Sequence, residues 1–331
     1  MARSELASAE WNLLECIANP LDLEATLTSG QSFRWRRHPN GIWWGSIGDV
    51  FAALWQAPGD PASPLYWQTF PWSNQHEAIR AYFRLEVPLE DLYASWIEKE
   101  PAIADAVREH RGLRILRQPP VECFFAFQCA TCNTVVKIQR SVYRLGERYG
   151  VVFEIPPIEP PYGVSAEDPH GRPAVQLPPA GGRVYGFPSI ERLSSADEEA
   201  LRTDLWGYRA PRVISLAQRL GPSGGEWLLS LRDVPYARAK QELLQFEGIG
   251  EKLADCICLF CLDKDEAVPV DTHVRQIACR LFLRELTEKS LTPRVYAAIS
   301  DAFRERFGEY AGWAQQYLFL GAMRRRRRQL E

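Results

Sequence analysis

The sequence contains no long hydrophobic run. Its longest apolar stretches, such as residues 257–262, are far shorter than the roughly 20 residues that a membrane-spanning helix needs. The N-terminus also lacks the succession of basic, apolar and small residues that marks a secretory signal. We therefore expect no membrane association and a cytoplasmic location.

An excess of basic residues is absent as well. The chain has 331 residues, with 39 Lys and Arg against 42 Asp and Glu, a net charge of −3 and a pI of about 6.1. Nucleic-acid binders usually carry a basic face, because neutralising phosphates supplies much of their affinity. Any prediction of such a partner must therefore rest on specific motifs. The five consecutive arginines at 324–328 could contact phosphates, although charged runs usually lie in solvent.

Eight cysteines are present, but without a secretion signal a disulfide framework is not expected. Two pairs, Cys129-x-x-Cys132 and Cys258-x-x-Cys261, have metal-ligand spacing. They lie far apart in the sequence, and the second falls in an apolar helical stretch. We therefore expect these cysteines to pack as small hydrophobic groups. The alternative is a zinc site.

The first hundred or so residues have the pattern of a β-rich unit. Short aromatic and β-branched runs at 32–36, 41–45 and 50–55 alternate with turn residues. Asn40-Gly41 is a strong hairpin signal between the first two runs. We expect the Trp and Phe side chains of these runs to pack in the core and across strands.

From about Ile103 the apolar periodicity becomes helical. A segment dense in Pro and Gly, at about 155–184, is expected to form an extended loop or insertion. The predicted fold class is α+β, with an antiparallel β-rich domain at 1–112 followed by an all-helical region at 113–331. The helical patterns cover 121–145, 191–205, 213–220, 236–246, 251–262, 273–283 and 293–307.

A turn between two of these helices has the sequence EGIG at 247–250. Two glycines around one apolar residue permit a tight hairpin with Ile249 pointing inward. The first N–H groups of the following helix are then free to bind an anion such as a DNA phosphate. A helix connection chosen only for steric reasons explains the glycines equally well.

Lys252 and Asp271 follow this turn. Lys252 lies in the first turn of a helix, where the helix dipole and partial desolvation both favour the neutral amine that a nucleophile needs. Asp271 occupies an N-cap position before the next helical pattern, from which a carboxylate can also offset positive charge on a sugar. A solvated lysine and a purely capping aspartate are the ordinary alternatives.

The motifs GIGEKLADC at 248–256 and VPVDTH at 268–273 together resemble the helix-hairpin-helix DNA glycosylase superfamily, and more narrowly the eukaryote-type 8-oxoguanine DNA glycosylase/AP lyase family. The resemblance extends over nearly the whole chain, with the proline-rich insertion as the main exception. Supporting motifs are SGQSFRW at 29–35, GFPS at 186–189, GYRA at 207–210 and YAGWAQ at 310–315.

The resemblance implies a bifunctional base excision repair enzyme that removes 8-oxoguanine from duplex DNA. The damaged nucleotide is flipped out of the helix, at a cost of a few kcal/mol in unstacking. Lys252 would attack the sugar C1′ and expel the base, and the resulting Schiff base can undergo β-elimination. Asp271 would stabilise the charged sugar.

The same resemblance implies a base pocket. Cys256 and Phe319 would sandwich the base, Gln315 would read its Watson–Crick edge, and Phe260 would also line the pocket. The carbonyl of Gly30 would accept the N7–H that oxidised guanine has and guanine lacks. A buried acceptor left unpaired costs about 1–3 kcal/mol, enough for discrimination.

Further residues are implied in DNA binding. Gly248 and Gly250 would hold the DNA backbone, with a structural cation possible on the hairpin carbonyls, and His273 would contact a phosphate. Tyr208 would wedge into the base stack, and Arg209 would contact the orphaned base.

Three positions depart from the family pattern. The family usually has three asparagines where this chain has Cys132-Asn133-Thr134, and an arginine where it has Lys137. Arginine and lysine differ in hydrogen-bond geometry. We therefore expect selection of the base opposite the lesion to differ more than the excision chemistry.

The expected partner is damaged double-stranded DNA, bound by a monomer in the nucleoid, or in the nucleus of a eukaryote. No cofactor is expected, and an iron–sulfur cluster is not supported because only Cys279 follows Cys261. Three rivals remain open: an alkylated-purine glycosylase, against which Lys252 argues, a non-catalytic DNA-binding module, and a zinc hydrolase using both C-x-x-C pairs.

Overall fold

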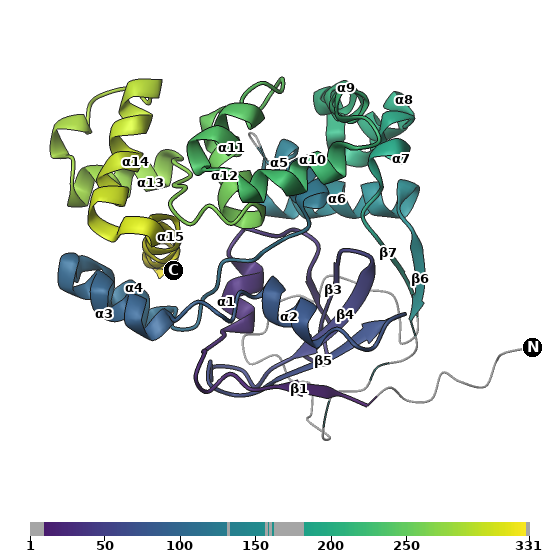
Figure 1. The fold of residues 1–331 in the computed structure, drawn as a ribbon, viewed down its shortest axis with the longest axis horizontal. Coiled ribbons are helices and arrows are strands. Elements are labelled where there is room, and N and C mark those ends of the chain that lie inside the picture. The colour runs from purple at the N-terminus through teal and green to yellow at the C-terminus, as the bar shows by residue number, and fades with distance from the viewer. Residues whose placement is uncertain (1–9, 131–132, 156–157, 159–160, 162–181, 329–331) are drawn as a thin grey trace, which may run out of the picture.

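The structure, a computed structural model, describes residues 10–130, 133–155, 158, 161 and 182–328. A five-stranded antiparallel sheet lies in the N-terminal part together with short helices, and helices make up most of the rest (Figure 1). This arrangement confirms the predicted α+β class. No helix within the described ranges has the length and apolar character needed to cross a membrane.

The sheet has five strands in the order β1-β5-β4-β3-β2. Strand β4 occupies the range predicted from the sequence, and the Asn40-Gly41 turn joins β2 to β3 as expected. Across this turn the His38 amide donates to the Ile42 carbonyl at 2.8 Å. The strands are β1 (Asn12–Leu14), β2 (Arg36–Arg37), β3 (Trp43–Ile47), β4 (Val50–Trp55) and β5 (Leu65–Phe70).

Both faces of the sheet are buried. Trp43 and Trp44 are neighbours on β3, and because successive side chains of a strand point to opposite faces, they join different apolar clusters. The cluster of Trp43 includes residues of helices α1 (Leu23–Thr28) and α2 (His76–Tyr82). This packing confirms the predicted core role of the aromatic side chains.

Helical structure is present well before Ile103, first in α1 and then in α2, so the expected onset near Ile103 was wrong. Helix α3 buries Leu89, Tyr93 and Trp96, which recur at helical spacing along one face. This face belongs to the core of the C-terminal helices, since α3 contacts α14 and α4 contacts α15 (Figure 1). These helices are α3 (Leu89–Lys99), α4 (Ala104–Glu109), α14 (Pro293–Phe307) and α15 (Ala311–Arg328).

The continuous helix expected over 121–145 is divided into α5 and α6. The break occurs at Thr134, whose hydroxyl caps α6 by accepting from the Lys137 amide at 3.4 Å. The pattern at 191–205 is also divided, into α7, α8 and a π-helical turn. The remaining helices are α5 (Pro120–Gln128), α6 (Val135–Tyr149), α7 (Ile190–Ser194), α8 (Glu198–Leu201), α9 (Ala210–Leu220), α10 (Gly224–Ser230), α11 (Tyr236–Leu243), α12 (Glu251–Cys261) and α13 (Thr272–Leu281).

The segment expected to be an insertion contributes one strand. Strand β7 (Gly182–Tyr185) pairs antiparallel with β6 (Val152–Ile155) in a two-stranded ribbon, so the loop assigned to about 155–184 was too long at its C-terminal end. The Gly186 amide extends the pairing by donating to the Val151 carbonyl at 2.7 Å. Residues 162–181 lie outside the described part of the chain.

Candidate active site

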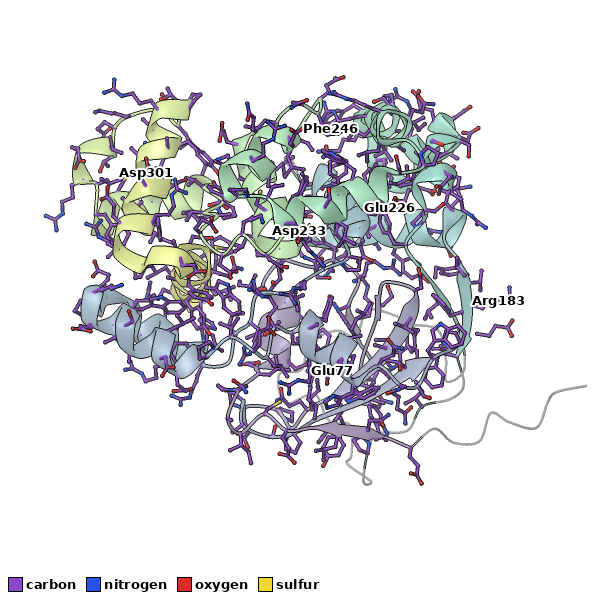
Figure 2. All side chains as sticks on the ribbon, in the orientation of Figure 1. Glu77, Arg183, Glu226, Asp233, Phe246 and Asp301 are labelled. Atoms are coloured by element: carbon purple, nitrogen blue, oxygen red, sulfur yellow. The ribbon has the colours of Figure 1, made fainter. Side chains whose placement is uncertain are left out.

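The hairpin at 247–250 joins α11 to α12 as the sequence predicted. Ile249 is buried, and its amide donates to the Phe246 carbonyl at 3.1 Å, which confirms its role as an inward plug. Phe246 lies among the helices beside this turn (Figure 2), where its ring contacts those of Phe124 and Trp227. Gly250 occupies the N-cap of α12 without a side-chain cap, so the first amides of α12 remain suited to an anion.

Gly248 is the position in this turn that requires glycine. Its φ is +80°, and a Cβ there would lie 2.6 Å from the Arg212 side chain. We expect Gly248→Ala to destabilise the fold by about 1–2 kcal/mol for the left-handed backbone alone. Gly250, with φ of −91° and open space around a Cβ, is the matched control. Denaturant unfolding measures both variants, and equal losses would contradict the argument.

Lys252 is the second residue of α12 and is half-buried. Its Nζ lies 5.7 Å from the centroid of the Phe127 ring, and its amine hydrogen-bonds to Cys256 one turn later. Phe127 stacks in turn on Phe260, with 5.7 Å between ring centroids. The amine therefore faces an apolar wall on one side and a thiol on the other.

The pKa of Lys252 was predicted to fall, but the structure indicates a rise. Electrostatic attraction to the Cys256 sulfur raises the pKa of Lys252, burial opposes this, and the hydrogen bond to Cys256 and the Asp271 charge add to the increase. Burial also raises the pKa of the Cys256 thiol. The prediction failed because it considered only desolvation and the helix dipole, and not the partners that tertiary packing supplies.

Asp271 caps α13, as predicted. Its Oδ1 accepts hydrogen bonds from the amides of His273 at 2.9 Å and Val274 at 2.8 Å, which fixes the orientation of the carboxylate. Its charge acts on Lys252, so the two side chains share one electrostatic environment. The structure therefore places the predicted carboxylate within electrostatic reach of the predicted nucleophile.

Residues from the two ends of the chain meet at the predicted base pocket. Gln316 on α15 donates a hydrogen bond to the Ser29 carbonyl at 3.1 Å. Gly30, the next residue, has a φ of +83°. This bond therefore holds Gly30 close to α15, the helix that carries Gln315 and Phe319. Gln315 is 3% exposed, and its Oε1 has no hydrogen-bond partner within the described residues. An unpaired buried acceptor of this kind suits a ligand N–H.

Phe319 links this pocket to Asp271. Its ring lies 6.2 Å from the ring of His273, centroid to centroid, and the amide of His273 is one of the two that bond to Asp271. Cys256 is buried on α12 beside Lys252. The pocket residues predicted from distant motifs are thus connected to the reactive pair through α12, α13 and α15.

The residues predicted to meet the opposite strand lie just before α6, on α6, and on the turn before α9. Tyr208 is 59% exposed, whereas Arg209 is 7% exposed and stacks on the Tyr208 ring at 4.3 Å. Lys137 is exposed, and Asn133 donates to the Cys129 carbonyl at 3.3 Å. Cys132 lies outside the described residues.

Comparison with known proteins assigns the family. Residues 13–124 match the 8-oxoguanine DNA glycosylase N-terminal domain, and residues 174–297 match the HhH-GPD superfamily base excision DNA repair protein. An N-glycosylase/DNA lyase OGG1 of Arabidopsis thaliana is 34% identical over 322 residues, which cover 95% of this chain and 80% of that protein. The chain belongs to the 8-oxoguanine DNA glycosylase family.

Solved structures of this family agree. The apo-form of Clostridium acetobutylicum 8-oxoguanine glycosylase/lyase is 26% identical, with a TM-score of 0.74 over 94% of this chain and 97% of that one. The same enzyme with double-stranded DNA containing cytosine opposite 8-oxoG shares the fold, with a TM-score of 0.76, 24% identity, and coverage of 96% and 98%. The family, the fold and the enzyme class predicted from the sequence are therefore confirmed.

Sequence patterns did not single out two residues of this glycosylase site. Phe127 faces the amine of Lys252, and Asp255 is fully buried three residues after it. Phe127 belongs to a continuous apolar run on α5. Nothing in that run indicates that Phe127 lies beside Lys252, which is far away in the sequence. Asp255 lies within the motif at 248–256. Its acidic side chain on an otherwise apolar face of α12 was a signal that could have identified it.

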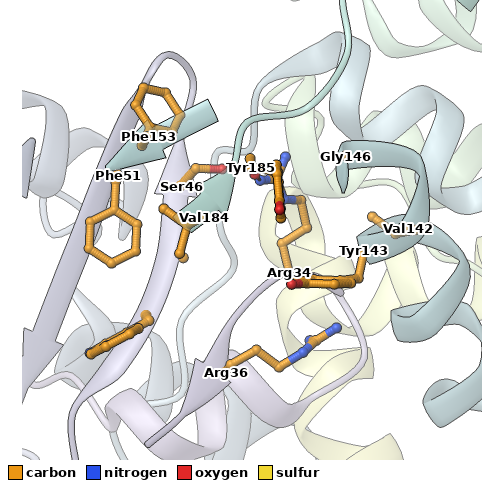
Figure 3. A pocket seen from close by; sticks show the side chains of 12 residues that line it. Arg34, Arg36, Ser46, Phe51, Val142, Tyr143, Gly146, Phe153, Val184 and Tyr185 are labelled. Atoms are coloured by element: carbon orange, nitrogen blue, oxygen red, sulfur yellow. Dashed lines mark hydrogen bonds between the residues drawn. The ribbon is translucent and has the colours of Figure 1, made fainter. Parts of the chain in front are cut away.

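A small cavity of about 50 Å³ that opens to solvent lies elsewhere in the glycosylase. Figure 3 shows Phe51 and Ser46 of the sheet on one side of it and Tyr143 of α6 on the other, with Tyr185 of β7 between. None of the predicted site residues lines this cavity. We therefore assign the chemistry to the Lys252 site, on the evidence of its side chains rather than of cavity size.

In the part of the chain that the structure describes, no three His, Cys, Asp or Glu side chains group as metal ligands. Cys258 and Cys261 are buried in α12, and the Cys261 thiol donates to the Ile257 carbonyl at 3.1 Å. They pack as the small hydrophobic groups that the sequence favoured. The other pair is described only at Cys129.

Proposed function

We propose that this glycosylase removes 8-oxoguanine from duplex DNA and then cleaves the strand, with Lys252 as nucleophile and Asp271 as its carboxylate partner. The observation that carries the proposal is that Asp271, at the N-cap of α13, acts electrostatically on Lys252, in the first turn of α12. Family membership supports the reaction class, and the Arabidopsis relative is itself named an N-glycosylase/DNA lyase.

The chemistry begins with the neutral amine of Lys252. Its nitrogen forms a bond to C1′ of the flipped nucleotide, the glycosidic bond breaks, and the base leaves with the bonding electron pair. Opening of the sugar ring and loss of an amine proton give the Schiff base. Removal of a C2′ proton then expels the 3′ phosphate by β-elimination. The Asp271 carboxylate stabilises the positive charge that develops on the sugar.

Base recognition is assigned to Gln315 and Gly30. The unpaired Oε1 of Gln315 is available to accept an N–H from the Watson–Crick edge of the base. The left-handed backbone at Gly30, held to α15 through Ser29, presents a carbonyl for the N7–H of 8-oxoguanine. Guanine has no hydrogen at N7, so binding it would leave that acceptor unpaired, at a cost of about 1–3 kcal/mol.

The DNA-binding residues divide into two groups. The amides of the hairpin at Gly248 and Gly250, with His273, bind the backbone near the lesion. Tyr208 wedges into the stack, and Arg209, whose guanidinium lies over the Tyr208 ring, contacts the orphaned base. Asn133 and Lys137 on the neighbouring segment complete the contact to the opposite strand.

Borohydride trapping tests the function directly. The protein is incubated with duplexes that carry 8-oxoguanine opposite each of the four bases, and an undamaged duplex is the control. A covalent adduct with the damaged duplexes alone supports both the lesion and the amine mechanism. Binding without an adduct for any opposite base would contradict the lysine mechanism.

The rise in the pKa of Lys252 gives a pH prediction. Because the neutral amine is the nucleophile, excision is expected to increase with pH as Lys252 loses its proton. Cys256→Ala removes the largest cause of that rise, so the pKa of Lys252 falls and the acid limb of the profile moves to lower pH. Single-turnover rates across pH give the midpoint, which an altered pocket contact alone would leave unchanged.

A further inference from the structure

A buried polar cluster lies beneath the catalytic helix. Asp255 follows Lys252 by three residues on α12, and its side chain is 0% exposed. Its carboxylate accepts hydrogen bonds from the hydroxyl of Tyr236 at 2.6 Å, the hydroxyl of Tyr296 at 2.6 Å and Nζ of Lys240 at 2.9 Å. Helices α11, α12 and α14 are therefore joined at one carboxylate.

The two tyrosines are alike toward Asp255 but differ in their other contacts. The hydroxyl of Tyr236 lies 3.3 Å from Nζ of Lys240, so its bonds stay between α11 and α12. The hydroxyl of Tyr296 accepts a hydrogen bond from the amide of Val270 at 3.1 Å. Val270 is buried and immediately precedes Asp271.

One phenol oxygen thus links the two segments that carry the reactive pair. On one side it bonds to Asp255, on the helix of Lys252, and on the other it bonds to the residue before Asp271. We propose that Tyr296 is a positioning residue, which fixes the carboxylate of Asp271 relative to the amine of Lys252. This inference rests on the proposed roles of those two residues.

Loss of the Tyr296 hydroxyl would leave the Val270 amide without this partner in the core, and the segment leading into Asp271 would shift. Displacements of about 1 Å in an active site can slow a reaction on the order of 100-fold. Of the DNA contacts assigned above, only His273 follows this segment directly, and the others lie on the hairpin, on the turn before α9 and at the start of α6. The effect should therefore appear in the rate of excision and not in the affinity for DNA.

Tyr296→Phe and Tyr236→Phe form a matched pair on the full chain. Each removes one hydroxyl that bonds to the same carboxylate over the same distance, but only the first releases Val270. The measurements are the single-turnover excision rate on duplex containing 8-oxoguanine, the dissociation constant for that duplex, and the melting temperature. Excess enzyme makes the rate constant independent of the fraction folded.

We expect Tyr296→Phe to slow excision roughly 10- to 100-fold with unchanged DNA affinity, while Tyr236→Phe stays near the wild-type rate. Equal rates in the two variants, or a loss of affinity in place of rate, would overturn the positioning role. If Tyr296→Phe does not fold, 3-fluorotyrosine at position 296 weakens the acceptor without removing it. A slower excision rate then supports the positioning role of Tyr296, and an unchanged rate refutes it.

The result for the wild-type protein distinguishes a failure of this inference from a failure of the proposed function. A wild-type protein that excises no 8-oxoguanine and forms no adduct overturns both. Wild-type excision with indistinguishable tyrosine variants overturns only the role of Tyr296.

Discussion

Replacing Lys252 by glutamine is expected to abolish the borohydride adduct. Glutamine keeps much of the length and polarity of the side chain, but its amide cannot form a Schiff base. Removing a nucleophile from an enzyme that depends on covalent chemistry costs on the order of 10⁴ to 10⁶ in rate, so residual excision should be barely measurable. Trapping on 8-oxoguanine duplex, together with single-turnover excision, gives both readings.

DNA binding should survive this change. The amides at the start of α12 that face the backbone do not depend on the Lys252 side chain. A gel-shift or anisotropy titration should therefore give a dissociation constant close to that of the wild type. Lys99→Gln, an exposed lysine at the end of α3, is the control for loss of a positive charge. An adduct that persists in Lys252→Gln would assign the nucleophile to another amine.

The sequence was sufficient where local chemistry decides the structure. The hairpin requires a glycine at Gly248 because the backbone is left-handed at that position. Asp271 caps α13 because its side chain reaches the amides two and three residues later. Strand β4 matched its predicted range for the same reason. Aromatic and β-branched residues between turn signals specify a strand without help from distant contacts.

The sequence was insufficient for properties that depend on contacts between residues far apart in the chain. The pKa of Lys252 is raised by partners whose placement depends on how α12 and α13 pack. Arg209 matches the family motif, yet its burial against Tyr208 follows only from the fold of the turn before α9. The bond from Tyr296 to Val270 joins residues 26 positions apart through a buried hydroxyl, for which no local pattern exists.

Asp271 carries two functions that substitution can separate. Asp271→Asn keeps an oxygen that can accept from the amides of His273 and Val274 but removes the negative charge. Asp271→Ala removes both the cap and the charge. We expect the alanine variant to lose about 1 kcal/mol of unfolding free energy and the asparagine variant much less. Excision should fall in both, by roughly 10²- to 10³-fold, because the charge that stabilises the developing sugar cation is gone.

The pH dependence decides which effect of the charge dominates. Asp271 also raises the pKa of Lys252, so its removal frees more of the amine and partly compensates at neutral pH. At alkaline pH the wild-type amine is already neutral, and this compensation disappears. The deficit of Asp271→Asn in single-turnover excision should therefore grow as pH rises. A deficit that shrinks as pH rises would contradict this argument, because it would mean that Asp271 helps Lys252 to lose its proton.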